Sequence, residues 1–363
     1  MNTHLSDNTI FDNAFVTIIM PIRNEASFIN RSLGSVLAQD YPHNLVEVII
    51  VDGMSDDGTM EIVQSIINNY SQTKDNNVPS PIHSPITLLD NPSRIVPTGL
   101  NSAIRHARGD IIIRVDGHAI IETDYVQQCV KVLKDTDAEC VGGTMVTVGE
   151  TWLARAISLA QSSFFGVGGV AFRTGRRQGC YVDTVAFGAY RRNVFNRIGG
   201  FDEELVRNQD DEFNFRLTQS GGKIWMDPSI RSVYYSRSSL RGLWKQYFQY
   251  GFYKVRVIQK RGAVPSWRHL IPAVFVLSLF LTIFMALFTF KPLWGIVVIG
   301  PYTGANLIAC LWVGRRNLRV LTILPVAFLI LHLSYGLGFL WGIWYWRRRR
   351  VGESRVSRVS RVS

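Results

Sequence analysis

Two stretches decide the fold: residues 46–56 read Val-Glu-Val-Ile-Ile-Val-Asp-Gly-Met-Ser-Asp, and residues 111–118 read Ile-Ile-Ile-Arg-Val-Asp-Gly-His. In each, a short apolar run ends at an Asp-Gly pair, which is typical of a buried strand that ends in a tight turn. Residues 16–20 form a third apolar run, closed by Pro21. Apolar residues recur at helical spacing within 28–37, 60–70 and 100–107. This alternation predicts an α/β fold with a mostly parallel sheet and helices on both faces.

Asp52 and Asp116 each stand where one of these predicted strands ends. The carboxyl ends of parallel strands lie at one edge of a sheet, and ligands bind beyond that edge. We therefore expect both carboxylates at the same edge, where Gly53 and Gly117 permit close backbone approach. Asp116 and His118 are two residues apart, a pair that can hold a divalent metal or simply belong to a turn.

The C-terminal third of the chain is predicted to associate with a membrane. Three apolar segments, at about 270–290, 293–313 and 320–344, are each long enough to cross a bilayer. The formal net charge is +11, and much of the excess flanks these segments. That placement favours an anionic membrane surface over a nucleic acid as the partner. The stretch before them mixes aromatic and basic residues in the manner of an interfacial amphipathic helix or of a helix that packs on a core.

These observations predict four parts: a cytoplasmic domain at 1–235, an amphipathic interfacial segment at 236–268, about three transmembrane helices at 269–346, and a basic tail at 347–363. The N-terminus lacks the apolar core of a signal peptide, and the four cysteines show no paired spacing. Both features favour a first domain that faces the cytoplasm, and we expect a multi-pass protein of the inner membrane.

The side of the tail stays open at this point. Three crossings would place it opposite the first domain, whereas its arginines favour the same side. Gly336, Gly338 and Gly342 make the third segment the one expected to follow a tilted or re-entrant course.

Three motifs follow one another in the first part of the chain. The first reads Ile-Met-Pro-Ile-Arg-Asn-Glu at 19–25, the second Ile-Val-Asp-Gly-Met-Ser-Asp-Asp-Gly-Thr at 50–59, and the third Arg-Gly-Asp-Ile-Ile-Ile-Arg-Val-Asp-Gly-His at 108–118. With these motifs in this order, residues 15–235 resemble family 2 glycosyltransferases with the GT-A fold. The resemblance implies that Pro21, Arg23, Glu25, Asp52 and Asp116 bind the nucleotide-sugar.

The same resemblance implies that Asp116 and His118 hold a divalent metal, Mn²⁺ or Mg²⁺. His118 departs from the family pattern, which usually has a second aspartate there. Imidazole is a credible manganese ligand. The metal would offset the charge that develops on the leaving diphosphate.

A later block places the acceptor chemistry. Gly-Gly-Phe-Asp-Glu at 199–203 precedes Asn-Gln-Asp-Asp-Glu at 208–212, similar to the family's turn and the helix start that carries the general base. The resemblance assigns that base to Asp210, with Asp211 as the rival one residue later. A single base that activates the acceptor implies inversion at the anomeric carbon. We expect Asp183, Asp211, Arg191 and Gln246 on the acceptor side, although surface charge explains Asp183 and Arg191 equally well.

The overall layout resembles the group of exopolysaccharide enzymes that includes the succinoglycan glucosyltransferase ExoA. The implied reaction adds one hexose from a UDP-sugar to a polyprenyl-diphosphate-linked saccharide. One alternative is a processive polysaccharide synthase, but the Gln-x-x-Arg-Trp motif of such enzymes is only partly matched at 246–250, Gln-Tyr-Phe-Gln-Tyr. A second alternative is a non-catalytic membrane scaffold, which retention of Asp52, Asp116 and Asp210 argues against.

Overall fold

The computed structural model describes residues 14–72, 85–236, 238–264, 266–315 and 317–359, with the backbone alone for 71–72 and 348–359. The described chain forms two compact units. The first unit is Met1–Val146 with Ala171–Tyr235, and the second is Thr147–Val170 with Ser236–Ser363. Residues 147–170, which the sequence analysis placed in the first domain, thus group with the C-terminal part. Beyond Arg347, the side chains of the basic tail lie outside the described residues.

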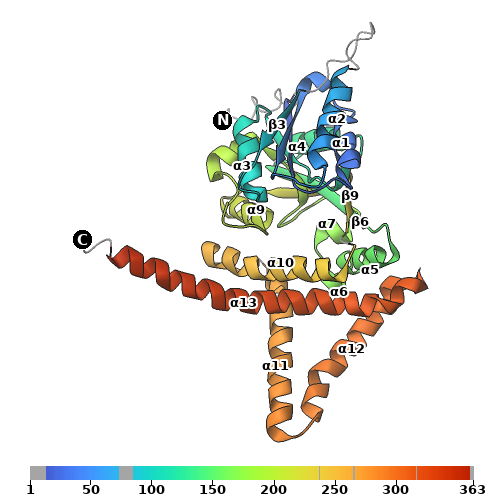
Figure 1. Cartoon of the computed structure of the whole chain (residues 1–363), viewed down its shortest axis with the longest axis vertical. Helices are drawn as coiled ribbons and strands as arrows, with labels where there is room; N and C mark the ends of the chain where they lie inside the picture. The colour runs from blue at the N-terminus through green and yellow to red at the C-terminus, as the bar shows by residue number, and fades with distance from the viewer. Residues whose placement is uncertain (1–13, 73–84, 237, 265, 316, 360–363) are drawn as a thin grey trace. The chain divides into compact units, whose positions relative to one another are not determined.

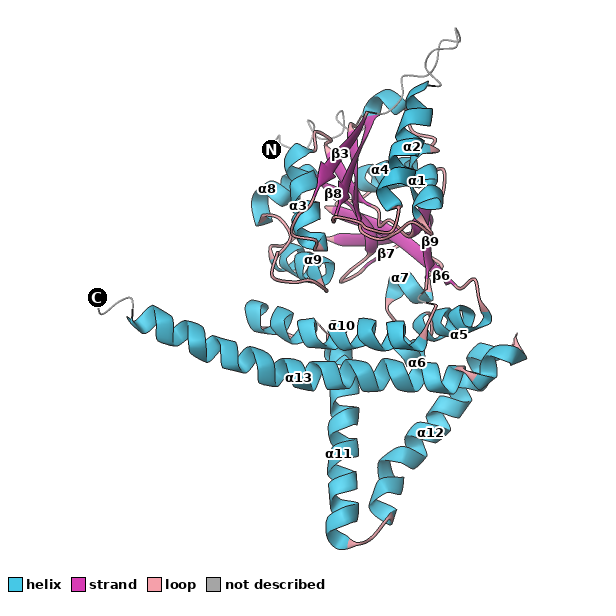
Figure 2. Ribbon diagram, viewed as in Figure 1, coloured by secondary structure: helices cyan, strands magenta, loops and turns pink. Residues whose placement is uncertain are grey.

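The first unit is built on a nine-stranded sheet in the order β3-β2-β1-β4-β8-β6-β9-β5, with β7 paired to β9 (Figure 2). Its strands are β1 Val16–Ile22, β2 Val46–Asp52, β3 Ile86–Asp90, β4 Ile111–Arg114, β5 Ala119–Ile121, β6 Cys140–Val148, β7 Cys180–Tyr181, β8 Ala186–Arg191 and β9 Ile224–Tyr235.

The first four strands of the sheet order are parallel, because β1 pairs in parallel with β2 and β4, and β2 with β3. All seven residues of β2 are buried, as expected for a strand covered on both faces. The pairings of β8 with β4 and β6 are antiparallel, as are those of β9 with β5 and β7. The predicted GT-A α/β architecture is confirmed, and the sheet is parallel in one half and mixed overall.

Helices cover both faces of this sheet, as the sequence predicts. Alternate residues of β1 point to opposite faces: Ile18 packs with α1 (Ile29–Leu37), α2 (Thr59–Gln72) and α4 (Tyr125–Asp135). Ile19 belongs to the opposite core with α3 (Val96–His106), α8 (Arg192–Ile198) and α9 (Gln209–Gln219).

The second unit is helical (Figure 1). Its helices are α5 Trp152–Gln161, α6 Phe164–Val167, α10 Leu240–Arg261, η3 Trp267–His269, α11 Ile271–Thr289, α12 Leu293–Gly314, η4 Leu318–Thr322 and α13 Leu324–Val359. The short α7 (Ala171–Thr174) belongs to the first unit, as does η2 (His43–Leu45).

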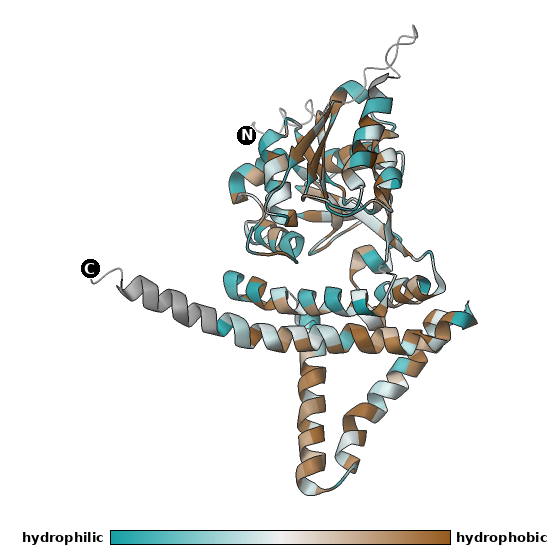
Figure 3. Cartoon of the chain, in the orientation of Figure 1, coloured by the Kyte–Doolittle hydropathy of each residue, from teal (hydrophilic) through white to brown (hydrophobic). Residues whose placement is uncertain are grey.

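Three stretches of the second unit are long and apolar enough to cross a membrane: Trp267–Thr289, Leu293–Gly314 and Leu324–Arg347. Figure 3 shows the hydrophobic colouring along α11 and over much of α12. The prediction of three long apolar helices in the C-terminal part is confirmed.

Candidate active site

The carboxyl ends of β1, β2 and β4 lie next to one another in the sheet. Ile22 at the end of β1 is in register with Asp52, and Ile19 is in register with Arg114 near the end of β4. Asp116 follows β4 by two residues. The structure therefore brings Asp52 and Asp116 to the same edge of the sheet.

Asp52 is buried and holds the turn that follows β2. Its two carboxylate oxygens accept hydrogen bonds from Ser55, one from the backbone N–H at 2.9 Å and one from Oγ at 2.6 Å. Ser55 Oγ in turn accepts from the backbone N–H of Asn24 at 2.9 Å. Asn24 has a φ of 54°, in the left-handed region that asparagine tolerates. Asp52 thus fixes the loops after both β1 and β2.

Pro21 and Arg23 flank the end of β1. Pro21 is half-buried and is in register with Val51. Arg23 is exposed, and its Nη1 donates to the backbone carbonyl of Arg94 at 3.0 Å. A Cβ at Gly53 would lie 3.2 Å from Cβ and Cδ of Arg23, so the glycine lets the arginine stem lie close over the turn.

Glu25 contacts the predicted metal ligand. Its Oε1 lies 2.7 Å from Nδ1 of His118, and both side chains are largely buried. A carboxylate oxygen accepts, so Nδ1 carries the proton. In the neutral imidazole this leaves the lone pair on Nε2. Gly117 permits the contact, because a Cβ there would lie 2.9 Å from Cγ of Glu25. The edge of the imidazole also packs on Tyr234, with ring centroids 5.0 Å apart.

Asp116 is paired with Arg114 through both carboxylate oxygens. Nε of Arg114 donates to Oδ1 at 2.9 Å, and Nη2 donates to Oδ2 at 3.2 Å. Burial raises the pKa of Asp116, but attraction to Arg114, and then to His118 and Arg207, outweighs burial and holds the pKa below its usual value. Burial lowers the pKa of Arg114, yet Asp116 and Asp210 outweigh it and raise that pKa. Both groups are therefore charged near neutral pH.

Asp210 lies in the first turn of α9 and is the other carboxylate near Arg114. Its Oδ2 is 3.9 Å from Nη1 of Arg114, and its side chain is 45% exposed, so solvent and ligands can reach it. Its Oδ1 accepts from the backbone N–H of Asp211 at 2.9 Å. Acidic side chains at a helix N-terminus are also favoured by the helix dipole. The single guanidinium of Arg114 thus lies between the predicted donor-side and acceptor-side carboxylates.

The turn that precedes α9 is held from α3. Asn101 Oδ1 accepts from the backbone N–H of Phe201 at 2.7 Å, and its Nδ2 donates to the Phe201 carbonyl at 2.8 Å. The same Nδ2 donates to Glu203 Oε1 at 2.9 Å. A Cβ at Gly200 would lie 2.5 Å from Asn101 Oδ1, which explains a glycine there. The Gly-Gly-Phe-Asp-Glu block is therefore an anchored turn that positions the start of α9.

The structure does not bring Arg191 together with this group. It is in register with Ile111, at the opposite end of β4 from Asp116. Its guanidinium donates to the backbone carbonyls of Leu133 and Ala138. The family resemblance implied an acceptor-side place for Arg191, but β8 runs antiparallel to β4 and carries this residue away from Asp116.

The other three residues predicted on the acceptor side, Asp183, Asp211 and Gln246, lie in different parts of the structure. Asp183 is exposed between β7 and β8, and Asp211 follows Asp210 in α9. Gln246 is buried in the second unit. There its Nε2 donates to the Tyr250 hydroxyl at 3.0 Å, and its Oε1 accepts from Gln161 Nε2 at 3.5 Å.

Sequence reasoning missed Arg114. A signal was present, because Arg114 is the one charged residue of an otherwise apolar strand and stands two residues before Asp116. Arg207 was also missed. Its charge lowers the pKa of Asp116, but its proximity to Asp116 depends on the loop before α9.

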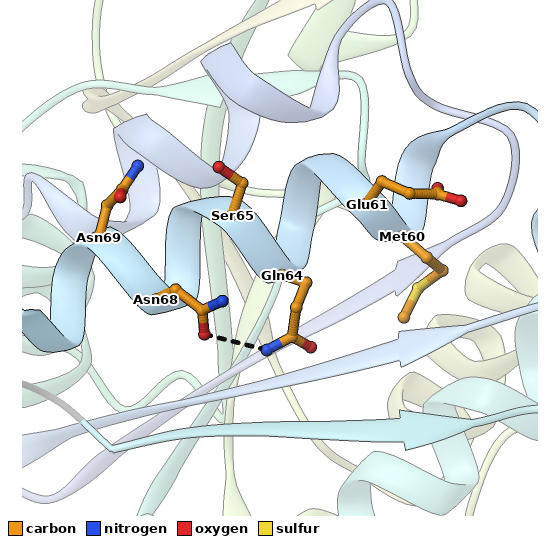
Figure 4. A pocket seen from close by; sticks show the side chains of 6 residues that line it. All are labelled: Met60, Glu61, Gln64, Ser65, Asn68 and Asn69. Carbon is orange, nitrogen blue, oxygen red and sulfur yellow. Dashed lines mark hydrogen bonds between the residues drawn. The ribbon is translucent and has the colours of Figure 1, made fainter.

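A hollow along α2 contains none of these residues (Figure 4). It is lined by Met60, Glu61, Gln64, Ser65, Asn68 and Asn69. All six come from one helix, and Gln64 Nε2 donates to Asn68 Oδ1 at 3.2 Å. This hollow is a solvated helix face.

The residues present fit a divalent metal that is held partly by the protein and partly by the diphosphate of a bound nucleotide-sugar. No three His, Cys, Asp or Glu side chains of the described residues converge as a metal cage. A carboxylate has about four acceptor positions, and Arg114 uses two on Asp116. His118 has Nε2 remaining once Nδ1 contacts Glu25. A carboxylate that orients a metal-binding histidine through its other nitrogen is the usual outer-shell arrangement.

Comparison with known proteins gives a family and several relatives. The sequence profile described as glycosyl transferase family 2 matches residues 17–199. The chain is 32% identical to the succinoglycan biosynthesis protein ExoA of Rhizobium meliloti (strain 1021), over 92% of this chain and 96% of that protein. It is 28% identical, over 91% and 97%, to a Methanococcus voltae protein, dolichyl N-acetyl-alpha-D-glucosaminyl phosphate 3-beta-D-2,3-diacetamido-2,3-dideoxy-beta-D-glucuronosyltransferase.

Among solved structures, the fold is similar to mannosyltransferase PcManGT from Pyrobaculum calidifontis in complex with GDP-Man and Mn²⁺. The TM-score is 0.58 at 19% identity, and the match covers 91% of this chain and 88% of that one.

Proposed function

The chain belongs to glycosyl transferase family 2 and is a glycosyltransferase of glycan biosynthesis, and we propose that it moves one hexose, with inversion, from a UDP-sugar to a polyprenyl-diphosphate-linked saccharide. The observation that carries this proposal is the position of Arg114 between Asp116 and Asp210. This arrangement would place a bound donor next to a bound acceptor, and direct transfer requires that proximity.

Asp210 acts as the general base in this proposal. It takes the proton of an acceptor hydroxyl while that oxygen bonds to the anomeric carbon from the face opposite the leaving group. The bond from that carbon to the diphosphate oxygen breaks, and the nucleoside diphosphate leaves with the electron pair. Oδ2 of Asp210 lies 3.9 Å from Nη1 of Arg114, and the exposed side chain of Asp210 can reach the hydroxyl of a bound acceptor.

The donor lies across the loops after β1 and β2. Pro21, Arg23 and Asp52 border the nucleotide, with Asp52 acting partly through Ser55, and Asp116 lies toward the sugar and diphosphate. Glu25 acts through His118, which it holds at 2.7 Å. Asp183 and Asp211 stay as the acceptor-side residues of the first unit.

Asp116 and Nε2 of His118 are the groups that would hold Mn²⁺ or Mg²⁺, together with diphosphate oxygens. The metal would neutralise charge on the leaving diphosphate. Glu25 keeps the imidazole oriented and its tautomer fixed, and Arg114 keeps Asp116 ionised at working pH.

The lipid-linked acceptor is supported by two relatives that cover nearly the whole chain. One is named for succinoglycan biosynthesis, and the other for a transferase whose acceptor is a dolichyl-phosphate-linked sugar. Three helices able to cross a bilayer would bring the enzyme to such an acceptor. We place the protein in the inner membrane as a multi-pass protein, with residues 1–235 on the cytoplasmic side where nucleotide-sugars occur.

A processive synthase is the second candidate. Its Gln-x-x-Arg-Trp motif has Gln249 and Tyr250 in the last two positions here. Gln246 is buried and bonded to Tyr250 and Gln161, so its side chain is already engaged within the second unit. These features favour single addition.

The test is product analysis with membranes that contain the enzyme, supplied with radiolabelled UDP-hexoses, GDP-mannose and lipid-linked saccharide acceptors. The proposal expects one sugar added to the lipid-linked acceptor from a UDP-hexose. GDP-mannose, the donor named for the Pyrobaculum structure, serves as the discriminating donor. Long polymer would favour the processive synthase, transfer from GDP-mannose alone would reject the UDP assignment, and no transfer from any donor would favour a scaffold.

A further inference from the structure

The third apolar helix, α13, lies along α10 rather than apart from it (Figure 1). Glycines on both helices bring the two backbones into contact. A Cβ at Gly251 would lie 2.1 Å from the carbonyl oxygen of Tyr335, and one at Gly338 would lie 2.1 Å from that of Phe248. One turn further along α13, a Cβ at Gly342 would lie 2.8 Å from the Phe252 oxygen.

The contact continues to the end of the apolar part of α13. Trp346 Nε1 donates to the backbone carbonyl of Phe252 at 3.3 Å, and its ring lies 5.0 Å from the guanidinium carbon of Arg256. The segment of α13 from Tyr335 to Trp346 is therefore at the same level as the middle of α10.

α10 cannot lie in the hydrocarbon core of a bilayer. Its 22 residues include six basic side chains, those of Arg241, Lys245, Lys254, Arg256, Lys260 and Arg261. A charged side chain at the centre of the bilayer costs at least about 2.5–3.5 kcal/mol. α10 therefore lies at the level of the headgroups or above, and the part of α13 that contacts it must lie there too.

The other two apolar helices are different. In the most apolar part of each segment, 17% of the residues are buried for α11 and 11% for α12. The corresponding share for α13 is 44%. No charged residue occurs within Ile271–Thr289 or Leu293–Gly314. At 1.5 Å per residue, α11 is about 28 Å long and α12 about 33 Å, close to the thickness of the hydrocarbon core.

α11 and α12 form a hairpin whose open end lies at α13. A Cβ at Gly336 of α13 would lie 2.3 Å from the carbonyl oxygen of Pro272, so the start of α11 meets α13. Asn306 Nδ2 in the second half of α12 donates to the Pro325 carbonyl at 3.1 Å. The closed end, at Phe290–Pro292, is the far end of the hairpin in Figure 1.

Positive charge is concentrated at the open end. Arg268 precedes α11, and Arg315, Arg316 and Arg319 follow α12, whereas Lys291 is the one basic residue at the closed end. Such a difference between two short flanks orients a hairpin with its open end toward the cytoplasm.

We propose that only α11 and α12 cross the bilayer, as a hairpin, and that α13 lies with α10 in the plane of the membrane surface. The partner of this surface is a phospholipid bilayer. Acyl chains cover α11 and α12, and the outward side of α13 rests at the headgroup boundary through Val326, Leu329, Trp341, Ile343 and Trp344, which are exposed in the structure. Trp341 and Trp344 suit that boundary, where indole rings accumulate.

Two crossings return the chain to the face from which it entered. The first unit and the C-terminal end are then on the same side, and a tail rich in arginine agrees with the charge rule. The inference does not depend on the identity of the sugar or of the acceptor.

The first test measures sidedness with the full-length protein in sealed vesicles of known orientation. In a Cys180→Ser background, single cysteines replace Asp124 in the first unit, Lys291 at the closed end and Ser363 at the C-terminus, and a membrane-impermeant maleimide is applied from either side. We expect Asp124→Cys and Ser363→Cys to react from one side and Lys291→Cys from the other. Reaction of Ser363→Cys on the side opposite to Asp124→Cys would overturn the proposal.

The second test measures depth and separates an in-plane α13 from one that enters and leaves the bilayer on one side. Fluorophores on cysteines at Val326, Leu329, Trp341 and Ile343 are quenched by lipids spin-labelled at the headgroup or at mid-chain. We expect the quenching ratio to vary less than about twofold along α13 if that helix stays at one depth. Matched cysteines at Val274, Leu277, Leu281 and Phe284 of α11 must show a steady change with position. A maximum of mid-chain quenching within α13 would reject the in-plane helix.

Discussion

Nη1 of Arg114 lies 3.9 Å from Oδ2 of Asp210, although the two residues are on β4 and α9, with four strands (β5 to β8) between them in the chain. The other side of the same guanidinium binds Asp116. An arginine can hold two carboxylates in this way because its donors are fixed in a plane. The chemistry of donor and acceptor is therefore linked through one buried cation.

Asp210→Asn should abolish transfer while donor binding is retained. The amide keeps the shape of the side chain but cannot take a proton, so we expect kcat to fall about 10²–10⁴-fold. Turnover with saturating donor and acceptor, together with calorimetric titration of the nucleotide, measures both parts. Asp211→Asn is the matched variant, and if it removes activity while Asp210→Asn does not, the base is Asp211.

Arg114→Lys should impair the enzyme although charge is conserved. Lysine cannot bind both oxygens of Asp116 and still reach Asp210, so we expect kcat to fall about 10²-fold. In Arg114→Met the pKa of Asp116 should rise, because the attraction that lowers it is removed. The acid limb of the activity profile should then move to higher pH relative to the wild type. An unchanged profile in Arg114→Met would contradict the proposed role.

Glu25→Gln should weaken metal binding without removing a metal ligand. Loss of the carboxylate at Nδ1 leaves the orientation and tautomer of His118 less fixed, and such changes reduce metal affinity about 10–100-fold. Titration of activity with Mn²⁺ measures the shift. His118→Asp should keep or raise manganese-dependent activity, because it supplies the second carboxylate that the family resemblance implies at this position. Full activity of the wild type in EDTA would remove the metal from the mechanism.

Glu47→Gln should destabilise the first unit in a pH-dependent manner. Glu47 is buried on β2 and accepts from Thr17 Oγ1 at 2.7 Å and from Arg108 N at 2.6 Å. Burial raises its pKa, but these hydrogen bonds and the charge of Arg108 outweigh burial, so the pKa lies below its usual value. Its contribution to folding is therefore complete above the unfolded pKa of about 4.3 and is lost as the pH falls through the folded pKa.

We expect Glu47→Gln to lower the free energy of unfolding by about 1–3 kcal/mol at pH 7, with a smaller difference from wild type below about pH 4. Denaturant unfolding at both pH values measures this. Glu61→Gln, on the exposed face of α2, is the matched control and should change stability by less than about 0.5 kcal/mol. Equal effects of Glu47→Gln at both pH values would contradict the assigned ion pair.

Local patterns were enough to predict three of the four parallel strands, β1, β2 and β4, but not β3. Residues 48–51 are a continuous apolar run, and residues 111–115 are apolar except for Arg114. Such runs predict strands covered on both faces wherever they pair. The antiparallel half is different, because β6, β8 and β9 pair across long separations, and their neighbours depend on the path of the chain. The position of Arg191 depends on such a pairing, that of β8 with β4.

In the site, too, some features follow from local sequence and others depend on contacts between distant residues. Asp52 and Asp116 could be placed at one edge because strand ends are visible in the sequence. The contact of Glu25 with His118 could not, because it depends on the left-handed residue Asn24 and on the close approach that Gly117 permits. The proximity of Asp210 depends on a turn held by Asn101, a residue 100 positions before Phe201.

The second compact unit contains Thr147–Val170, a segment that interrupts the first unit in the chain. This arrangement limits how the enzyme can be shortened. A chain cut after Tyr235 would keep Thr147–Val170 but lose the helices on which that segment folds. Ala156, Ile157 and Ala160 of α5 are fully buried with Leu243, Leu324 and Phe328. Their exposure would leave an apolar patch prone to aggregation. A water-soluble catalytic fragment therefore calls for replacement of this insertion by a short linker, not for truncation alone.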